Sequence, residues 1–204
     1  MLDHLVFAVA DLDAGMALIE ERLGIRPAPG GKHVARGTHN ALLSLGRSTY
    51  LEIIAPDPAQ PGARPLPFGL EGLREPRLVT WAAKAPDIEQ RVETARAAGY
   101  DPGAIVQMSR ELPDGGRLNW SLTLPRPDAG DGLVPFLIRW EPGPHPSETS
   151  PPGCDLIALR REHPEPERVR AVLGALGVEL PVERAPEPAL IATIRGPKGE
   201  VELR

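Results

Sequence analysis

Two ionisable side chains interrupt apolar runs in the first quarter of the chain. His4 lies within LDHLVFAV (2–9), and Glu52 lies within STYLEIIA (48–55). Because strand side chains alternate between two faces, each of them shares a face with apolar neighbours. A buried carboxylate costs several kcal/mol unless it is paired or binds a cation. An imidazole and a carboxylate that face one cavity suit acid–base chemistry or half of a divalent metal site; a histidine at a sheet edge with a backbone partner is the alternative for His4.

The stretch GGKHVARGTHN (30–40) offers further polar groups. Gly30 and Gly31 permit a sharp turn or a close approach of the backbone to another group. We expect His33 and Asn40 at or near a ligand pocket, with the imidazole and the amide on its wall. The alternative is a glycine-rich connection between strands with solvated histidines.

All three tryptophans, Trp81, Trp120 and Trp140, fall between residues 77 and 141. They are predicted to line a ligand cavity, and the alternative is that they fill the core between a sheet and a helix. Arg110 and Arg139 lie in or beside the same predicted strands. An arginine in a cavity would suit a ligand that bears a carboxylate, whereas an arginine on the outer face is solvated.

The elements that position these residues follow one order three times. Each repeat opens with a strand, continues into a helix that ends at a glycine, and closes with three further strands. The three predicted helices cover 12–23, 87–98 and 166–176, and the glycines that end them, Gly24, Gly99 and Gly177, are separated by 75 and 78 residues. This near-constant period predicts three β-α-β-β-β modules. Their ranges are 1–75, 76–142 and 153–204.

Composition limits the classes of function. The chain has 204 residues, of which 41% are apolar and 25% charged, and its net charge is −5 with no block of like charges. This balance argues against nucleic acid as a partner, because phosphate binding needs a concentrated basic patch. No apolar run approaches the roughly 20 residues of a membrane span, and no signal peptide is evident. We therefore expect a cytoplasmic protein without a membrane partner.

Three stretches rich in proline and glycine, 56–67, 125–132 and 141–153, are predicted to be loops. His145 and His163 lie in proline-rich linkers and are expected to be exposed, although His145 follows the last strand of the second module and is in a position to cap the cavity. Cys154 is the only cysteine, so no intrachain disulfide forms. We expect it to be buried as a small apolar residue.

The module order, with LDHLVFAVADL in a first strand and YLEIIAP in a fourth, resembles the vicinal oxygen chelate superfamily. The stretch PGGKHVARGTHNALLSLGRSTYLEII resembles its glyoxalase-like domain branch more narrowly. The resemblance covers about residues 1–142 and is most specific over 2–55. It implies paired modules that curl into a half-open barrel around a cavity. Many members bind one divalent metal ion there, which polarises a substrate with adjacent oxygens.

The resemblance also implies that each paired module supplies one metal ligand from its first strand and one from its last. On this basis His4 and Glu52 are predicted to bind the metal. Counted from the glycines that end the helices, the second and third modules place Val79 and Ile157 at the position of His4. Around the position of Glu52 the second module has Ile138, Arg139 and Trp140. The ligand set therefore looks incomplete: either the metal site lacks a second pair of ligands, or a ligand comes from elsewhere in the chain.

Together these features predict an α+β fold, in which repeated β-α-β-β-β modules form curled mixed sheets with a central cavity. The predicted function is a glyoxalase-like small-molecule enzyme, a lyase, isomerase or dioxygenase. His4 and Glu52 would be metal ligands or the catalytic acid and base, and the ligand would contact the residues His33, Asn40, Trp81, Trp120 and Trp140. A protein that binds or sequesters a small molecule without turnover is the alternative. Sheet edges in such modules also favour a homodimer.

Overall fold

The computed structural model describes residues 1–204 except 34–35, 47, 64, 112–115 and 125–129. Its elements are β1 (Leu2–Ala8), α1 (Leu12–Leu23), β2 (Ala28–His33), β3 (Thr38–Ser44), β4 (Tyr50–Pro56), η1 (Pro67–Gly72), β5 (Arg77–Lys84), α2 (Ile88–Ala97), β6 (Ile105–Glu111), β7 (Arg117–Thr123), β8 (Phe136–Trp140), α3 (Pro146–Thr149), β9 (Asp155–His163), α4 (Pro166–Ala175), β10 (Glu183–Arg184), β11 (Ala189–Gly196) and β12 (Gly199–Leu203). Among these helices, none is long and apolar enough to cross a lipid bilayer.

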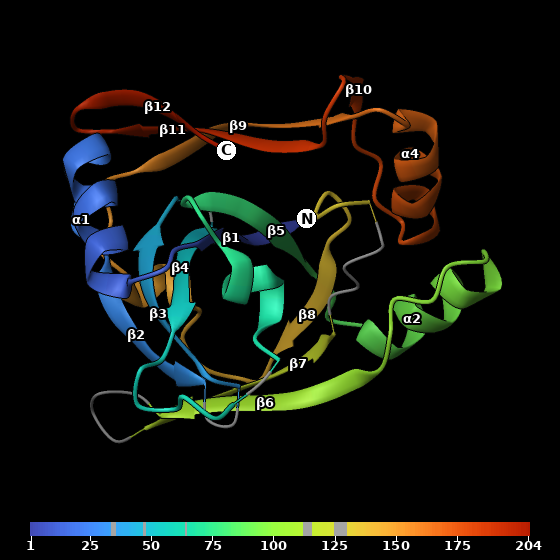
Figure 1. Ribbon diagram of the computed structural model, residues 1–204. Coiled ribbons are helices and arrows are strands. Elements are labelled where there is room, and N and C mark those ends of the chain that lie inside the picture. The colour runs from blue at the N-terminus through green and yellow to red at the C-terminus, as the bar shows by residue number, and fades with distance from the viewer. Residues whose placement is uncertain (34–35, 47, 64, 112–115, 125–129) are drawn as a thin grey trace.

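Eight strands form one curled sheet in the order β2-β3-β4-β1-β5-β8-β7-β6. The sheet curls until its two edge strands, β2 and β6, approach each other (Figure 1). β1 runs parallel to β4, and β5 runs parallel to β8 in the same way. The two sets of four strands join where β1 and β5 pair antiparallel. The predicted α+β class with a curled mixed sheet is therefore confirmed.

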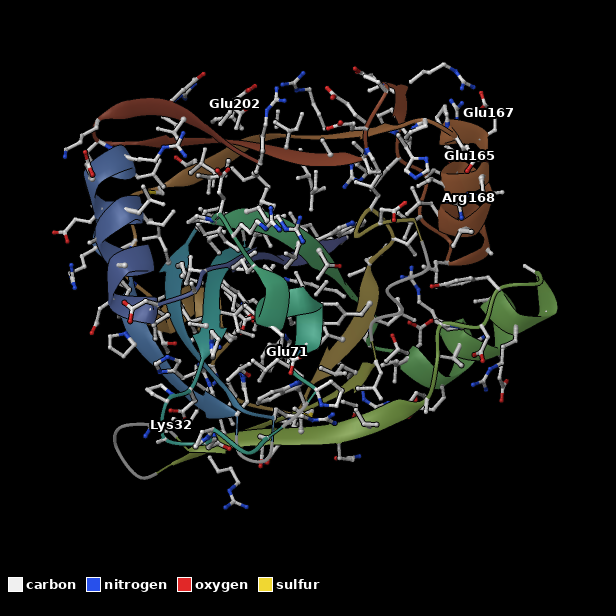
Figure 2. All side chains as sticks on the ribbon, viewed as in Figure 1. Lys32, Glu71, Glu165, Glu167, Arg168 and Glu202 are labelled. Atoms are coloured by element: carbon white, nitrogen blue, oxygen red, sulfur yellow. The ribbon has the colours of Figure 1, made fainter. Side chains whose placement is uncertain are left out.

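The third predicted module contributes a separate four-stranded sheet in the order β10-β9-β11-β12. This sheet, together with α1 and α4, lies against the outer face of the large sheet (Figure 1). One core joins these layers, in which Leu5 and Phe7 of β1 share a cluster with residues of all three long helices and with Ile194 of β11. Charged side chains labelled in Figure 2, Glu202 of β12 and Glu165, Glu167 and Arg168 near α4, lie at the periphery of this layer.

The helices begin and end close to where the sequence predicts. α1 covers 12–23 as predicted, because Asp11 caps its first turn by accepting a hydrogen bond from Ala14 N at 2.8 Å, and Gly24 ends it with φ of 87°. Two strands are worth noting beside these helices. β2 begins at Ala28, five residues after α1 ends. β10 has only two residues after Pro181, which has no N–H to donate to a ladder.

Trp81 lies in the layer between the two sheets. Its side chain is fully buried, and its Nε1 donates a hydrogen bond to the Leu133 carbonyl at 2.8 Å. The guanidinium of Arg161, from β9, lies 4.7 Å from the centre of the Trp81 ring. Burial lowers the pKa of Arg161 to about 10, and the cation–π contact offsets part of the cost of burying this charge.

His163 does not lie in an exposed linker, as the sequence predicts. It ends β9 and is buried, with Nε2 3.0 Å from Oδ2 of Asp131 and with Nδ1 accepting a hydrogen bond from Glu165 N. These contacts tie the small sheet to the loop before β8. Cys154 is buried, as expected, and burial raises the pKa of its thiol.

The concave face of the large sheet has its own apolar lining. Val6 and Ala8 of β1 and Ile54 of β4 face inward with residues of β7 and β8. The segment around η1 lies within the curl of the sheet, where Glu71 is labelled in Figure 2. Leu66 and Leu70 of this segment pack against the same apolar lining. The curled sheet and this segment together enclose the space that holds the candidate site.

Candidate active site

A cavity lies on the concave face of the eight-stranded sheet. Its empty volume is about 770 Å³, part of which is continuous with solvent. The strands β1 to β4 supply most of its polar lining, whereas β6 to β8 supply mainly apolar and aromatic side chains. The lining residues are His4, His33, Arg36, Thr38, Asn40, Leu42, Tyr50, Glu52, Ile54, Pro67, Phe68, Met108, Arg110, Trp120, Leu122, Leu124, Phe136, Ile138 and Trp140.

A buried carboxylate holds the ring of His4. The pairing of β1 with β5 shifts register between Leu2 and His4, and this irregularity lies at Asp3. The Asp3 side chain, which is completely buried, has Oδ1 2.7 Å from Nδ1 of His4. Its Oδ2 accepts a hydrogen bond from Trp140 Nε1 at 3.1 Å and lies 3.1 Å from His145 Nε2. Asp3 therefore links β1 to β8 and to the segment that follows it.

These contacts determine which nitrogen of His4 carries a proton. Burial by itself would raise the pKa of Asp3, but hydrogen bonds from His145 and His4 outweigh it and hold the pKa well below its usual range. Because an ionised carboxylate only accepts hydrogen bonds, Nδ1 of His4 must carry the proton. The other nitrogen, Nε2, is thereby directed toward Glu52 in the cavity. The ring also stacks on Tyr50, with centroids 4.6 Å apart.

Glu52 stands at the centre of the polar end of the cavity. Its side chain is buried, with the residue 8% exposed. Oε1 accepts a hydrogen bond from Asn40 Nδ2 at 2.6 Å and lies 3.8 Å from Nε2 of His33. Oε2 lies 3.6 Å from Nε2 of His4, too far for a hydrogen bond. Within the described part of the chain, one oxygen of this carboxylate is thus held in place and the other is left for a ligand.

Asn40 joins two opposite charges. While Nδ2 donates to Glu52, Oδ1 accepts a long hydrogen bond from Arg110 Nη1 at 3.4 Å. Arg110 comes from β6, across the curl of the sheet, and is also buried. Burial lowers the pKa of this guanidinium, although Tyr50 and Glu52 act in the opposite sense. The sequence prediction for Asn40 had no means of specifying this bridge, because Arg110 is 70 residues away in the chain.

His33 lies beside this bridge, at the end of β2. Its Nδ1 is 3.0 Å from Thr38 Oγ1, and its Nε2 is 3.4 Å from Nδ2 of Asn40. Burial lowers the pKa of His33, which outweighs the opposite effect of Glu52. The imidazole is therefore neutral near pH 7. With Asn40 as the donor to Nε2, the proton of His33 resides on Nδ1 and faces Thr38.

The three tryptophans separate into two groups. Trp120 and Trp140 line the cavity, with their rings 5.3 Å apart. Trp81 does not, because it projects from the opposite face of β5 into the core between the two sheets. The prediction of Trp81 as a ligand-binding residue is therefore corrected, and the core alternative holds for it. His145 is half-buried rather than exposed, because it contacts Asp3, Tyr50 and Trp140.

Gly30 allows Asn40 and Arg110 to approach each other. A Cβ built at this position would collide with Oδ1 of Asn40 and with Nη1 of Arg110. We expect Gly30→Ala to displace this contact and to lower the free energy of unfolding by about 1–3 kcal/mol, as overpacked substitutions do. Chemical denaturation measures the change. Gly62→Ala is the matched control, because a Cβ there would meet nothing within 4 Å; equal effects of the two variants would contradict the role of Gly30.

The donor set does not fit the metal site of two ligand pairs that the sequence resemblance implies. His4 and Glu52 lie next to each other, but the corresponding strands of the second module, β5 and β8, supply no second pair of ligands. Ala82 of β5 lies opposite His4, and β8 contributes Phe136, Ile138 and Trp140 to the cavity. Asn40 already donates to Glu52, and the cationic Arg110 borders the same cavity. Among the described residues, no group of three or more His, Cys, Asp and Glu side chains is placed to hold a metal ion. We therefore assign no chemical step to a metal.

Asp3, Tyr50 and Phe136 border or support the site without being predicted from the sequence, and for Arg110 the sequence is compatible with either a cavity or a solvated position. Asp3 precedes His4 directly, and the alternation of an ideal strand would direct it to the opposite face. Only the register shift in β1 brings its carboxylate to the imidazole. Tyr50 had a detectable signal, since it shares the inward face of β4 with Glu52 and Ile54. Arg110 had no such signal, because the curl of the sheet determines what it contacts.

The structure resembles solved proteins of low sequence identity. A hypothetical protein from Staphylococcus aureus is 15% identical and aligns with a TM-score of 0.68, covering 98% of this chain and 83% of that chain. Methylmalonyl-CoA epimerase from Mycobacterium tuberculosis is 22% identical, with a TM-score of 0.45 and coverage of 70% and 88%. A variant of the Streptomyces coelicolor methylmalonyl-CoA epimerase, in complex with 2-nitronate-propionyl-CoA, is 16% identical, with a TM-score of 0.44 and coverage of 67% and 94%.

No curated protein matches the chain. The protein-family model of the glyoxalase-like domain matches residues 2–177. This range extends beyond the range 1–142 of the sequence resemblance and includes β9 and α4. The matched range contains every residue that lines the cavity. The chain belongs to the glyoxalase-like domain family.

Proposed function

We propose that the protein is a small-molecule enzyme that uses Glu52 as a general base to remove a proton from a carbon atom next to a carbonyl group. The observation that carries the proposal is the state of this carboxylate. It is buried, one oxygen is fixed by Asn40, and the other faces the cavity without a hydrogen bond from any described residue. A general base must reach its proton directly, and a buried carboxylate with one oxygen free toward the cavity meets this condition.

The remaining polar groups have roles in this scheme. The proton passes from carbon to Oε2 of Glu52, and the electron pair of the broken C–H bond moves into the carbonyl, which becomes an enolate. Burial raises the pKa of Tyr50 well above its usual value, so its hydroxyl stays protonated. We assign Tyr50 as the donor to the enolate oxygen. Return of a proton to the opposite face of that carbon completes an isomerase reaction, and expulsion of a leaving group from the neighbouring carbon completes a lyase reaction.

His4 and His33 flank the base, and both are positioned by other side chains. Asp3 holds His4 and Thr38 contacts His33, and each imidazole directs Nε2 toward a different oxygen of Glu52. The lone pair on Nε2 of His4, which faces Oε2, accepts the proton that this oxygen has taken up. His4 thus offers a route by which the proton is passed on before a second turnover, whereas His33 positions Asn40 beside the other oxygen.

Hydrogen–deuterium exchange at carbon tests the proposal. The purified protein is incubated in D₂O with 2-oxobutanoate, with its methyl ester and with butanone, and NMR follows the loss of the proton signal next to the carbonyl. We expect the protein to accelerate exchange in at least one probe. Binding of the probes without any acceleration would contradict the proposal and would favour the alternative, a protein that sequesters a small molecule. The apolar wall formed by Trp120, Phe136 and Trp140 favours that alternative.

The metal-dependent route makes a different prediction. If His4 and Glu52 bound an essential divalent ion, a chelator would abolish exchange and a stoichiometric addition of the ion would restore it. We expect exchange to be unchanged after dialysis against EDTA, because Asn40 and Arg110 already engage the polar end of the cavity. Exchange rates and metal content measured on the same samples provide the check. Loss and recovery of activity with one ion per chain would restore the metal hypothesis.

A further inference from the structure

Arg110 is a buried cation whose hydrogen-bonding capacity is only partly used. The residue is 6% exposed and borders the cavity from β6. Its Nη1 makes the long contact with Asn40, and its Nε is buried without a hydrogen-bond partner. No carboxylate among the described residues lies within 4.0 Å of its guanidinium. A buried guanidinium that lacks a partner is costly, so this arrangement calls for a ligand.

The shape of a guanidinium restricts the ligand that would satisfy it. Nε and an Nη nitrogen form a planar fork that matches the two oxygens of a carboxylate. Burial lowers the pKa of Arg110, which is the direction expected when a cation is desolvated without its own anion. The cavity that Arg110 borders is also lined by apolar side chains, among them Met108, Trp120 and Leu122. A ligand at this place therefore combines a carboxylate with a short apolar body.

We propose that Arg110 binds the carboxylate of the substrate, so that the substrate class is small carboxylic acids that also carry a carbonyl group. This inference rests on the proposed function of Glu52. Asn40 connects the two groups, since its Oδ1 faces Arg110 and its Nδ2 holds Glu52. A carboxylate on Arg110 places the next carbons of the same molecule beside the free oxygen of Glu52. The buried arginine thus selects the substrate and orients its C–H bond toward the base.

A second arginine at the cavity provides an internal comparison. Arg36 also lines the cavity, but it is exposed, and its Nη2 lies 3.7 Å from Sδ of Met108. A solvated arginine gains little from binding an anion, because water already satisfies its N–H groups. Arg139 lies outside the cavity and pairs with Glu89 at 2.6 Å. Arg36→Met and Arg139→Met are therefore the matched controls for Arg110→Met.

The test measures binding of benzoate and of 2-oxobutanoate, each beside a neutral counterpart, benzamide and methyl 2-oxobutanoate. Calorimetry gives the affinities, and the ¹H–¹⁵N signal of Nε–H in Arg110 reports on the guanidinium itself. We expect each acid to bind at least about tenfold more tightly than its neutral counterpart and to shift the Nε–H signal. Arg110→Met should remove this preference, and Arg110→Lys, which keeps the charge but loses the fork, should weaken it. Arg36→Met and Arg139→Met should retain it.

Three results would overturn the assignment. They are equal affinity for acids and neutral counterparts, an Nε–H signal that neither acid moves, and a preference that depends on Arg36 instead. Thermal melting identifies an Arg110→Met protein that has not folded, and in that case Arg110→Lys and the Nε–H signal of the wild-type protein decide. The outcome is separable from that for Glu52. If the protein prefers acids but does not accelerate exchange at carbon, the role of Glu52 as a base is contradicted and the role of Arg110 stands. If 2-oxobutanoate and its methyl ester exchange equally fast, the role of Arg110 is contradicted and the role of Glu52 stands.

Discussion

Glu52→Gln is expected to reduce the rate of deuterium exchange at carbon by about 10²- to 10⁴-fold, the usual contribution of a general base. Glutamine keeps the shape of the side chain, and its carbonyl oxygen still accepts the hydrogen bond from Asn40. The fold and the affinity for 2-oxobutanoate should therefore remain close to those of the wild type. The amide has no carboxylate oxygen to take up a proton, so the loss should appear in the rate of exchange and not in binding.

The control for this variant is Glu89→Gln. Glu89 is exposed in α2 and pairs with Arg139, away from the cavity. The same chemical change there should leave exchange unaltered, so any general effect of losing one negative charge is excluded. An exchange rate in Glu52→Gln that equals that of the wild type would show that another group, or a metal-bound species, removes the proton.

Asp3→Asn is expected to be the most destabilising of the conservative substitutions at the site. The carboxylate is completely buried and lies within hydrogen-bond distance of His4, Trp140 and His145. An amide in its place presents an N–H₂ group to partners that are themselves donors. We expect a loss of about 2–4 kcal/mol in the free energy of unfolding, since one member of a buried charged network is removed. Denaturant titration at pH 7 measures it.

The dependence of stability on pH should change with it. Because the folded pKa of Asp3 is depressed, its ionised form contributes stability above the unfolded pKa of about 3.9. That contribution is lost as pH falls below the unfolded pKa and toward the folded one. Wild-type stability should therefore fall more steeply than that of Asp3→Asn as the pH drops below about 4. Asp13→Asn, an exposed change in α1, serves as the control, and a slope in Asp3→Asn equal to that of the wild type would contradict the account.

The meeting of His4 and Glu52 followed from local patterns. Each of them lies on a strand whose residues two positions away, on the same face, are apolar. The period of a strand and the order of elements in the repeat were enough to predict that the two side chains face one cavity. In the structure β1 and β4 pair in parallel, with His4 opposite Tyr50 and Val6 opposite Glu52. Both side chains consequently face the cavity. The helices were predicted closely for a similar reason, since capping residues and terminal glycines act within a few residues.

The remaining features depend on how distant segments meet. Trp81 faces the core because antiparallel pairing of β5 with β1 directs Ala82, and not Trp81, to the side of His4. Asp3 reaches His4 through a register irregularity that no alternation pattern predicts. The contacts of Arg110 depend on the curl of the sheet, which brings β6 next to β2. The periodicity of the sequence predicts which side chains share one face of a strand. The way the sheet closes determines which strand faces line the same cavity.

A crystal structure of the protein, purified without chelator and soaked with 2-oxobutanoate, would show whether Glu52 acts as a base or as a metal ligand. We expect the ligand carboxylate to lie on Arg110 and the carbon next to the carbonyl to lie within about 3.5 Å of Oε2 of Glu52, the distance of a reactive complex. We also expect no anomalous scattering between His4 and Glu52. An anomalous peak at about 2.0–2.2 Å from both His4 Nε2 and Glu52 Oε2, the bond lengths of a zinc ion, would contradict the role of Glu52 as a base and establish a metal centre.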